Sequence, residues 1–297
     1  MPIERIEGVT YGVDDIALGT RYLEDLGLEK VEHGGHGAVF RTLENQTVEL
    51  RERSDAALPP AVVPGPTMRE TTWGVRNKGD LDALGGELAK DRQVHKDPSG
   101  ALHTVDESGF GIAFRVSTPT PIQSDPILSN VSGSRPRVNK PVELVERARP
   151  IRLLHVGFHI RSPGHEDASD FYLNRLKFRL TDRIVSDGDF MRCEGSQDHH
   201  NLLLLHRNNK LEFAHFAFEV RDIDEIIIGG QYMKRKGWTA GKTPGRHILG
   251  SNLNWFFRNP CGGNVEFTAD FDRVDETWQP RIFEKHPGVE AWHFDPD

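Results

Sequence analysis

Three short apolar runs in the second half of the sequence each carry one side chain that can bind a metal. They are Leu154–Phe158 with His155, Phe213–Phe218 with His215, and Asn264–Phe267 with Glu266. A His or Glu that faces inward from a hydrophobic strand must find a partner, because an unpaired buried polar group costs several kcal/mol. We therefore expect these three side chains to share one partner. Two imidazoles and one carboxylate form the facial triad that holds Fe(II) and leaves positions open for substrate and oxygen.

The elements that position these residues follow the same order in both halves of the chain. In the first half, the alternation of apolar residues predicts strands at 3–13, 38–42, 47–51, 71–75 and 111–116, and helical spacing predicts helices at 16–26 and 80–90. In the second half, we expect strands at 155–160, 190–192, 201–205, 213–220, 253–257 and 264–269, with helices at 166–176 and 222–236. This order predicts a supersecondary unit that is repeated four times.

Laying one half over the other shows which half carries the chemistry. Tyr11-Gly-Val-Asp matches Phe158-His-Ile-Arg, Trp73-Gly-Val-Arg matches Phe218-Glu-Val-Arg, and Gly111-Ile-Ala-Phe matches Asn264-Val-Glu-Phe. By these registers His155, His215 and Glu266 align with Gly8, Glu70 and Ala113. Ligand-type residues at all three positions in only one half are hard to attribute to core packing. We infer that the N-terminal half keeps the architecture and lacks the metal site.

A polar connection separates the two halves. Residues 117–150 are rich in Pro, Ser and Asn, which is typical of an extended surface linker. We place a domain boundary near residue 145, which gives an N-terminal domain at 1–145 and a catalytic domain at 146–297. The tail after Phe271 contains Trp278, Trp292 and Phe294, enough aromatic area to pack on the body or on a neighbouring subunit. We expect the protein to form a homo-oligomer.

Composition and charge exclude several classes of protein. The net charge is −8 and the isoelectric point is near 6.0, and no Lys/Arg stripe interleaves with aromatics, so we expect no nucleic-acid partner. No run approaches the ~18 apolar residues that a membrane span needs, and no signal peptide is evident. Cys193 and Cys261 lie far apart, which argues against a disulfide framework. We expect a soluble cytoplasmic protein that acts on a small molecule.

Several motifs of the second half resemble those of a known family. They are Leu-His155-Val-Gly-Phe, Asp198-His-His200-Asn-Leu-Leu-Leu, Ala-His215-Phe-Ala-Phe, Gly245-Arg-His247, and Asn259-Pro-Cys-Gly262 followed by Val265-Glu266-Phe. The sequence resembles the vicinal oxygen chelate (glyoxalase/bleomycin-resistance) superfamily, and within it the two-domain type I extradiol ring-cleaving dioxygenases. The resemblance implies an α+β fold with two domains, each made of paired βαβββ modules that form an open, barrel-like cup.

The resemblance also implies a reaction and a set of site residues. His155, His215 and Glu266 would bind Fe(II), or Mn(II) as in some members. The substrates would be O2 and a catechol-like aromatic diol whose two oxygens chelate the metal, and the ring would open beside the diol. His200 matches the family's acid or base near oxygen, a role that suits a side chain titrating near neutrality. His247 matches the residue that hydrogen-bonds the substrate.

One position departs from the family pattern. The family has a Tyr nine residues after the counterpart of His247, and this sequence has Phe256 there. We interpret Phe256 as a pocket wall. Its neighbour Trp255 does not replace the phenol, because adjacent strand residues point to opposite faces.

Three further residues are candidates for substrate binding beside Phe256. Trp255 and Phe190 would shape the pocket or fill the barrel, and Arg246 would meet an anionic substituent or lie in a solvated turn. The adjacent pair His199 and His200 poses a choice, because only one of two neighbouring strand residues faces the cup. The family register selects His200.

Two other functions stay open beside the extradiol dioxygenase. One is a metal-dependent oxygenase, isomerase or lyase of the same superfamily that acts on a substrate other than a catechol. The other is a non-catalytic protein of the same fold that binds a small molecule. The complete set of His155, His215 and Glu266 favours an enzyme, since binding proteins of this fold lack metal ligands.

Overall fold

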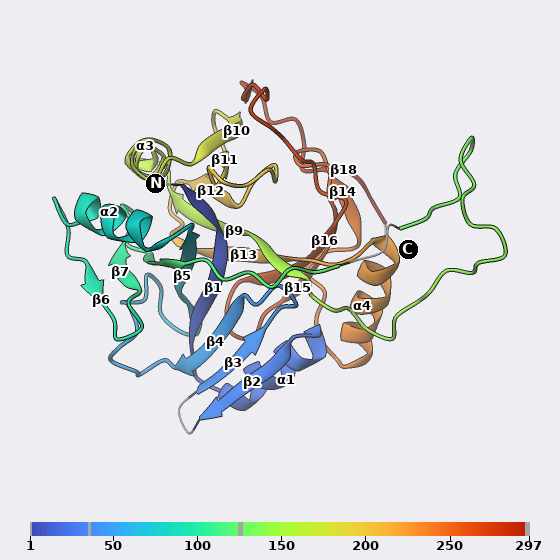
Figure 1. Ribbon diagram of the computed structural model, residues 1–297, viewed down its shortest axis with the longest axis horizontal. Helices are drawn as coiled ribbons and strands as arrows, with labels where there is room; N and C mark the ends of the chain where they lie inside the picture. Colours follow the sequence, from blue (N-terminus) through green and yellow to red (C-terminus); the bar gives the residue numbers. More distant parts are fainter. Residues whose placement is uncertain (1, 35–36, 124–126, 295–297) are drawn as a thin grey trace.

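Each half of the chain forms one mixed β-sheet, and few helices accompany them (Figure 1). The computed structural model describes residues 2–34, 37–123 and 127–294. The first sheet has the strand order β2-β3-β4-β1-β5-β8-β7-β6, and the second has the order β17-β10-β11-β12-β9-β13-β16-β15-β14-β18. The second sheet ends in β17 on one side and β18 on the other, so it is an open sheet within the described ranges. The predicted α+β class is confirmed.

The secondary structure follows the repeat that the sequence predicts. The elements of the first half are β1 Ile3–Val13, α1 Ile16–Leu26, β2 Glu29–Gly34, β3 Gly37–Arg41, β4 Thr47–Glu52, β5 Thr67–Val75, α2 Lys78–Leu88, β6 His95–Lys96, β7 Leu102–Val105 and β8 Gly111–Val116. Those of the second half are β9 Arg152–Arg161, α3 His165–Asp170, β10 Arg179–Ile184, β11 Gly188–Arg192, β12 Leu202–Arg207, β13 Glu212–Glu219, α4 Ile223–Arg235, β14 Gly245–His247, β15 Leu253–Arg258, β16 Asn264–Ala269, β17 Arg281–Phe283 and β18 Glu290–His293. Four βαβββ units result, two in each half.

Strand pairing confirms the registers that the comparison of the two halves suggested. β1 and β5 form the antiparallel centre of the first sheet, and β9 and β13 form that of the second. In the first sheet Gly8 lies opposite Thr72, and Thr72 lies opposite Ala113. The equivalent residues of the second sheet are His155, Ala217 and Glu266, so two of the three are candidate metal ligands.

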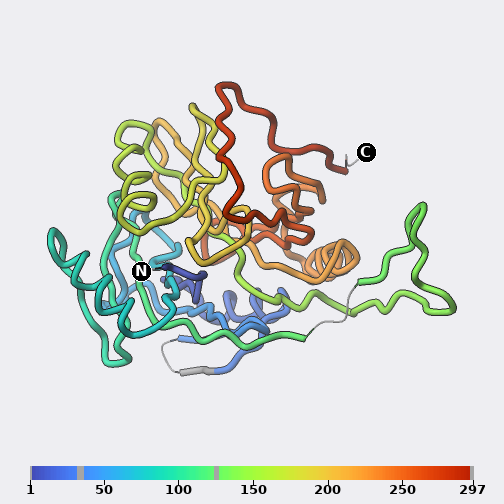
Figure 2. The backbone as a smooth tube through the Cα atoms, turned by 45° about the horizontal axis from the view of Figure 1, so that its top comes forward, coloured from blue at the N-terminus to red at the C-terminus, as the bar shows by residue number. Residues whose placement is uncertain are grey.

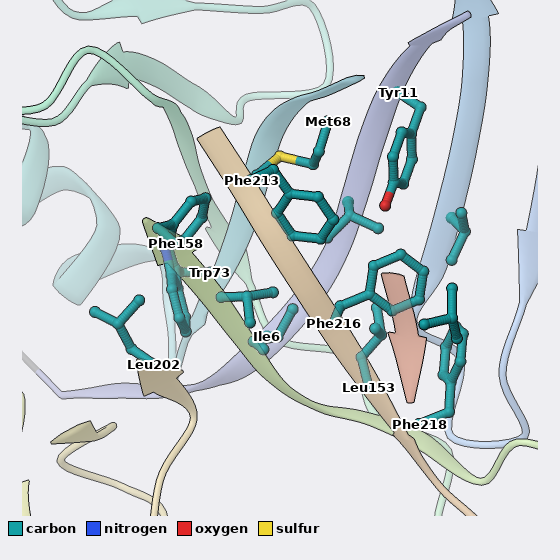
Figure 3. Close-up of a cluster of buried hydrophobic side chains, with 14 of the residues drawn as sticks. Ile6, Tyr11, Met68, Trp73, Leu153, Phe158, Leu202, Phe213, Phe216 and Phe218 are labelled. Atoms are coloured by element: carbon teal, nitrogen blue, oxygen red, sulfur yellow. The ribbon is translucent and has the colours of Figure 1, made fainter. Parts of the chain in front are cut away.

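The hydrophobic core lies between the central strands of the two sheets (Figure 3). Tyr11 of β1 makes edge contacts with Phe213 and Phe216 of β13, at ring-centroid distances of 5.9 and 6.0 Å. Because successive strand residues alternate in direction, one face of the second sheet packs on the first sheet. The opposite face is left free to form a site.

One predicted helix differs from the structure. The helix expected over 166–176 consists of α3 followed by a π-helical turn, Phe171–Arg175. The Leu176 N–H donates to the carbonyl of Phe171 at 3.0 Å, which is the five-residue spacing of a π turn. Phe171 and Tyr172, the first two residues of this turn, are both buried.

The segment of the chain that joins β8 to β9 runs along the outside of both sheets. In Figure 2 its green and yellow-green part extends away from the body, and most of its described residues are exposed. The boundary predicted near residue 145 falls in this segment, and the division into two domains stays a prediction. The aromatic tail adds β17 and β18 to the second sheet of its own chain, while self-association stays a prediction. Within the described ranges, no helix has the length and apolar character needed to cross a membrane.

Candidate functional site

Three neighbouring strands place the candidate metal ligands on one face of the second sheet. His155 of β9 lies opposite Ala217 of β13, and Ala217 lies opposite Glu266 of β16. His215 precedes Ala217 by two residues, so its side chain points to the same face. The small side chain of Ala217 leaves room between the larger ones on both sides. The structure therefore brings together the three residues that the sequence singled out.

The distances between the ligand atoms fit one metal ion. His155 Nε2 lies 3.0 Å from His215 Nε2 and 3.2 Å from Glu266 Oε2, and His215 Nε2 lies 3.7 Å from the same oxygen. Metal bonds of about 2.0–2.2 Å at right angles place adjacent ligand atoms about 3 Å apart. In the part of the chain that the structure describes, these three residues are the group suited to hold a metal ion.

The hydrogen bonding of Glu266 supports the same conclusion. Its Oε1 accepts a hydrogen bond from Asn252 Nδ2 at 2.9 Å, whereas its buried Oε2 has no hydrogen-bond partner. Asn252 also donates to Thr268 Oγ1 at 2.8 Å, which fixes the amide. A buried carboxylate oxygen without a donor is costly, and a cation would satisfy it. The donor set thus fits a divalent transition metal with one carboxylate and two imidazole ligands.

A cavity of about 550 Å³ opens over the candidate metal ligands. Its polar side includes the candidate ligands with His200, His247 and Lys242, and its apolar side includes Phe190, Leu203, Phe213, Leu249 and Phe256. The N-terminal half contributes Val63, Pro66 and Thr67 to the wall, and the tail contributes His286 and Val289. A small aromatic molecule fits a pocket of this kind, with an apolar wall for the ring and a few polar groups for orientation.

His200 lines the cavity next to the candidate ligands. Its ring centroid lies 4.6 Å from that of His155 and 5.1 Å from that of Phe190. Burial, together with the charges of the neighbouring imidazoles, lowers the pKa of His200 well below its usual value. Burial and the neighbouring His155 lower the pKa of His215 in the same way. Both imidazoles are therefore neutral at pH 7, the form that binds metals or accepts protons.

The predicted choice between His199 and His200 rested on a wrong premise. The strand that was expected to begin at residue 201 begins at Leu202, and the two histidines lie in the irregular segment before it. Both are buried, and His199 Nδ1 lies 3.0 Å from His200 Nδ1. His200 faces the cavity, and His199 contacts the side of His200 that points away from the cavity.

His247 reaches the cavity from β14 and is held by the tail. Its Nδ1 lies 3.2 Å from Glu290 Oε2, and its Nε2 lies 3.8 Å from Glu266 Oε1. Burial alone would lower the pKa of His247, but the bond to Glu290 and the charges of both carboxylates raise it above its usual value. Burial alone would also raise the pKa of Glu290, yet the contact with His247 holds it at about 2. Glu290 thus keeps an N–H on His247.

The four predicted substrate-binding residues divide into two pairs. Phe256 and Phe190 line the cavity. Trp255 lies on the opposite face of β15, where its ring packs against Gly230 of α4 and its indole N–H donates to the Lys242 carbonyl. The prediction that it contacts substrate is therefore wrong, because adjacent strand residues alternate.

Arg246 is the other residue that the structure places away from the cavity. Its guanidinium donates to Asp270 at 2.8 Å and to the carbonyl of Ser251. It lies next to His247 on β14 and points to the opposite side. The basic residues that do line the cavity are Lys242, Arg207 and Lys210, and Lys242 Nζ lies 5.2 Å from the centre of the Phe256 ring.

Sequence reasoning missed several cavity residues. His159 lines the cavity, and its Nδ1 lies 3.1 Å from Glu212 Oε1. Its position four residues after His155 on one strand was the signal that could have found it, since residues at even spacing share a face. No local pattern marked Glu290 or Val63, because long-range contacts bring them to the cavity.

The strands that build the site match the model of a known family. A family model described as the Glyoxalase/Bleomycin resistance protein/Dioxygenase superfamily matches residues 152–267. The superfamily region starts at β9, ends in β16 and contains all three candidate metal ligands, while Glu290 and the rest of the tail lie outside it.

Two curated relatives match about half of the chain. Metapyrocatechase 2 from Cupriavidus necator is 33% identical over 150 residues, which are 50% of this chain and 46% of that protein. An iron-dependent extradiol dioxygenase from Rhodococcus jostii is 27% identical over 154 residues, which are 47% of this chain and 50% of that protein. The match thus spans about half the length of these relatives.

The fold extends over nearly the whole chain. The crystal structure of a Mn(II)-bound glyoxalase from Novosphingobium aromaticivorans superposes with a TM-score of 0.76 at 22% identity, over 98% of this chain and 91% of that chain. The N-terminal half, which the superfamily model does not cover, is therefore included in the fold that this chain shares with that structure.

Proposed function

We propose that the protein is an Fe(II)-dependent extradiol dioxygenase that cleaves the ring of a catechol-like aromatic diol with O2, with Mn(II) as the alternative metal. The observation that carries the proposal is the cluster of His155, His215 and Glu266 at the base of a partly apolar cavity. Two imidazoles and one carboxylate leave coordination positions free for the diol and O2. The names of the two curated relatives, a metapyrocatechase and an iron-dependent extradiol dioxygenase, support the same reaction.

The residues around the cavity would have different roles in the reaction. A bound metal would supply Lewis acidity and bring the two substrates together. His200, whose lowered pKa keeps it neutral, accepts the proton of a diol hydroxyl and later returns it. His247, which Glu290 keeps protonated at Nδ1, orients a substrate oxygen. The apolar wall with Phe190 and Phe256 holds the ring and limits the access of water.

Phe256 favours a second candidate function. No phenol stands at this position to hydrogen-bond a diol oxygen, and the ring lies 5.4 Å from that of His215. A metal-dependent oxygenase or isomerase that acts on a substrate other than a catechol would have no need of that phenol. This candidate keeps the same three metal ligands and differs in the substrate.

Reconstitution with Fe(II) tests the proposal. The protein is loaded anaerobically, mixed with a panel of simple and substituted catechols, and then exposed to O2 while oxygen uptake and the yellow ring-opened product are recorded. We expect stoichiometric uptake with at least one diol. Absence of uptake and of yellow product with every diol would contradict the dioxygenase and favour the second candidate.

Substitution of a single ligand tests the metal site independently of the substrate. We expect His215→Ala to lose bound iron, measured by mass spectrometry after gel filtration, because two ligands hold the ion much less tightly than three. The control is His159→Ala, which removes another cavity histidine from the adjacent strand and should retain iron. Equal iron content in the two variants would show that the ligands are assigned wrongly.

A further inference from the structure

A row of three side chains leads from the protein surface to the back of His200. Arg281 of β17 donates two hydrogen bonds to Asp182 of β10, from Nε at 2.7 Å and from Nη2 at 2.6 Å. Asp182 Oδ2 lies 2.9 Å from His199 Nε2, and His199 Nδ1 lies 3.0 Å from His200 Nδ1. Each group contacts the next through a polar atom, so the protonation of one fixes the hydrogen-bonding role of its neighbour.

The middle of this row is closed to solvent. The side chains of Asp182 and His199 are fully buried. The Trp278 ring lies 5.9 Å from that of His199, its indole N–H donates to the Thr181 carbonyl, and the Arg281 guanidinium covers its face at 5.0 Å. With water excluded, the ring nitrogens of His199 must be satisfied by Asp182 and His200.

The hydrogen-bond donors and acceptors of this row determine which ring nitrogen of His199 and of His200 carries the proton. Burial alone would raise the pKa of Asp182, but the bonds to His199 and Arg281 hold it below its usual value, so the group is a carboxylate that only accepts. His199 must therefore carry its proton on Nε2. A neutral imidazole has one donor and one acceptor, so His199 Nδ1 accepts, and His200 Nδ1 carries the proton that it receives.

We propose that His199, held by Asp182 and Arg281, is a positioning residue that fixes the tautomer of His200 and leaves His200 Nε2 as the unprotonated nitrogen facing the cavity. That tautomer is the one that can take a proton at Nε2. In the transfer, the O–H bond of the substrate breaks, its electron pair stays on oxygen, and an N–H bond forms at Nε2. The bond from Nδ1 to His199 persists throughout, so the ring need not turn.

Two features make this inference independent of the family assignment. Arg281 and Trp278 lie in the tail, outside the superfamily region of residues 152–267. Asp182, which they cover, lies inside that region but outside the cavity wall. The tail therefore contributes to the site in two places, through Arg281 behind His200 and through Glu290 behind His247. Only the identity of the proton donor rests on the proposed function.

Nitrogen NMR of the full chain tests the tautomer directly. The protein is labelled with 15N-histidine and loaded with diamagnetic Zn(II), and the His200 signals are assigned by their loss in His200→Gln. We expect His200 to carry its proton on Nδ1 in the unmodified chain. In Asp182→Asn the amide can donate to His199, which reverses both rings, and we expect the proton of His200 on Nε2.

Asp189→Asn is the matched control for this experiment. Asp189 is also a buried aspartate paired with an arginine, Arg183, and it lies on the neighbouring strand without contact to His199. We expect its spectrum to match that of the unmodified chain. His199→Phe provides a second variant in case Asp182→Asn does not fold, and there His200 should populate both tautomers. An Nε2 proton in the unmodified chain, or one tautomer in every variant, would overturn the proposal.

Turnover of the Fe(II)-loaded protein gives a second readout. We expect kcat of Asp182→Asn to fall at least ~10-fold with little change in KM, because an imidazole in the wrong tautomer loses its function as a base, as in the Asp→Asn variant of serine-protease triads. Asp189→Asn should stay within about threefold of the unmodified chain. If no diol is turned over by the unmodified chain, the proposed function fails, and the NMR result still decides the role of His199.

Discussion

Single side chains decide what this cavity can bind. Ala217 separates His155 from Glu266 by one strand, and its methyl group leaves the space in which their ligand atoms approach to 3.2 Å. A larger residue would fill that space. Phe256 faces the same space from β15, opposite Glu266, and limits the polar contacts that a ligand can make.

Phe256→Tyr adds a hydroxyl group to the cavity near His247, whose ring centroid lies 5.9 Å from that of Phe256. We expect a catechol to bind up to about tenfold more tightly, because one net hydrogen bond contributes about 0.5–1.5 kcal/mol. The dissociation constant is measured by anaerobic titration of the Fe(II)-loaded protein. Phe190→Tyr places a hydroxyl group elsewhere on the wall and serves as the comparison. Unchanged catechol affinity in Phe256→Tyr would contradict the role of this position.

At the scale of the element, strand alternation builds the site. On β9, His155, Gly157 and His159 point toward the cavity, while Val156 and Phe158 point into the core. Gly157 is required by its neighbour, because a Cβ there would lie 2.7 Å from His215 Cε1 and 2.9 Å from His215 Nδ1. The His215 ring can therefore take its position only because residue 157 is a glycine without a Cβ.

Gly157→Ala tests this dependence. The alanine methyl group should push the His215 ring away from the other ligands and weaken metal binding about 10–100-fold, the effect typical of groups that orient a ligand. Metal affinity is measured by competition with a chelator. Gly86→Ala in α2, where an added Cβ meets nothing within 4 Å, is the control and should bind metal normally. Equal affinities in the two variants would contradict the steric argument.

Local periodicity predicts a supersecondary unit that is repeated four times and the row of ligands, because both depend on short-range alternation along strands, while the βαβββ composition of each unit came from the family resemblance. The role of His199 could not be predicted, since it depends on Asp182 and Arg281, which approach it through strand pairing. The directions of Trp255 and Arg246 were accessible in principle. Each is adjacent to a cavity residue on a strand, and alternation places it on the other face.

At the scale of the whole molecule, the two halves share one core and one cavity. Val63, Pro66 and Thr67 of the first half form part of the wall. A Cβ on Gly262 would lie 2.5 Å from the Pro66 carbonyl oxygen, so the turn before β16 lies directly against this segment. The half without metal ligands thus contributes to the shape of the site.

A buried carboxyl group joins the halves and should make stability depend on pH. Asp106 accepts hydrogen bonds from the Ser108 and Phe110 amides and from the Tyr172 hydroxyl, each at 2.9 Å. Burial raises the pKa of Asp106 to about 6, although these bonds lower it. Because the folded-state pKa lies above the ordinary 3.8, the stabilising contribution is complete below pH 3.8 and is lost as the pH rises through 6.

Asp106→Asn should remove this pH dependence. Between pH 4 and pH 7, we expect the unmodified chain to lose up to about 3 kcal/mol of unfolding free energy relative to the variant, since one pKa unit corresponds to about 1.4 kcal/mol. Urea unfolding at both pH values measures the difference. Asp224→Asn, at an exposed position of α4, should keep the pH dependence of the unmodified chain. Parallel pH profiles for unmodified and Asp106→Asn chains would contradict the assignment.

The close packing at Gly8 limits how a metal centre could be engineered into the first sheet. A Cβ at this position would lie 2.5 Å from Thr47 Oγ1 and 2.8 Å from the Thr47 carbonyl oxygen, so any histidine there collides with the backbone of β4. The first sheet therefore cannot gain a metal centre by exchanging side chains at Gly8 and Ala113 alone. The β4 backbone would have to move as well, so a second metal centre in this sheet would require a redesign of β4.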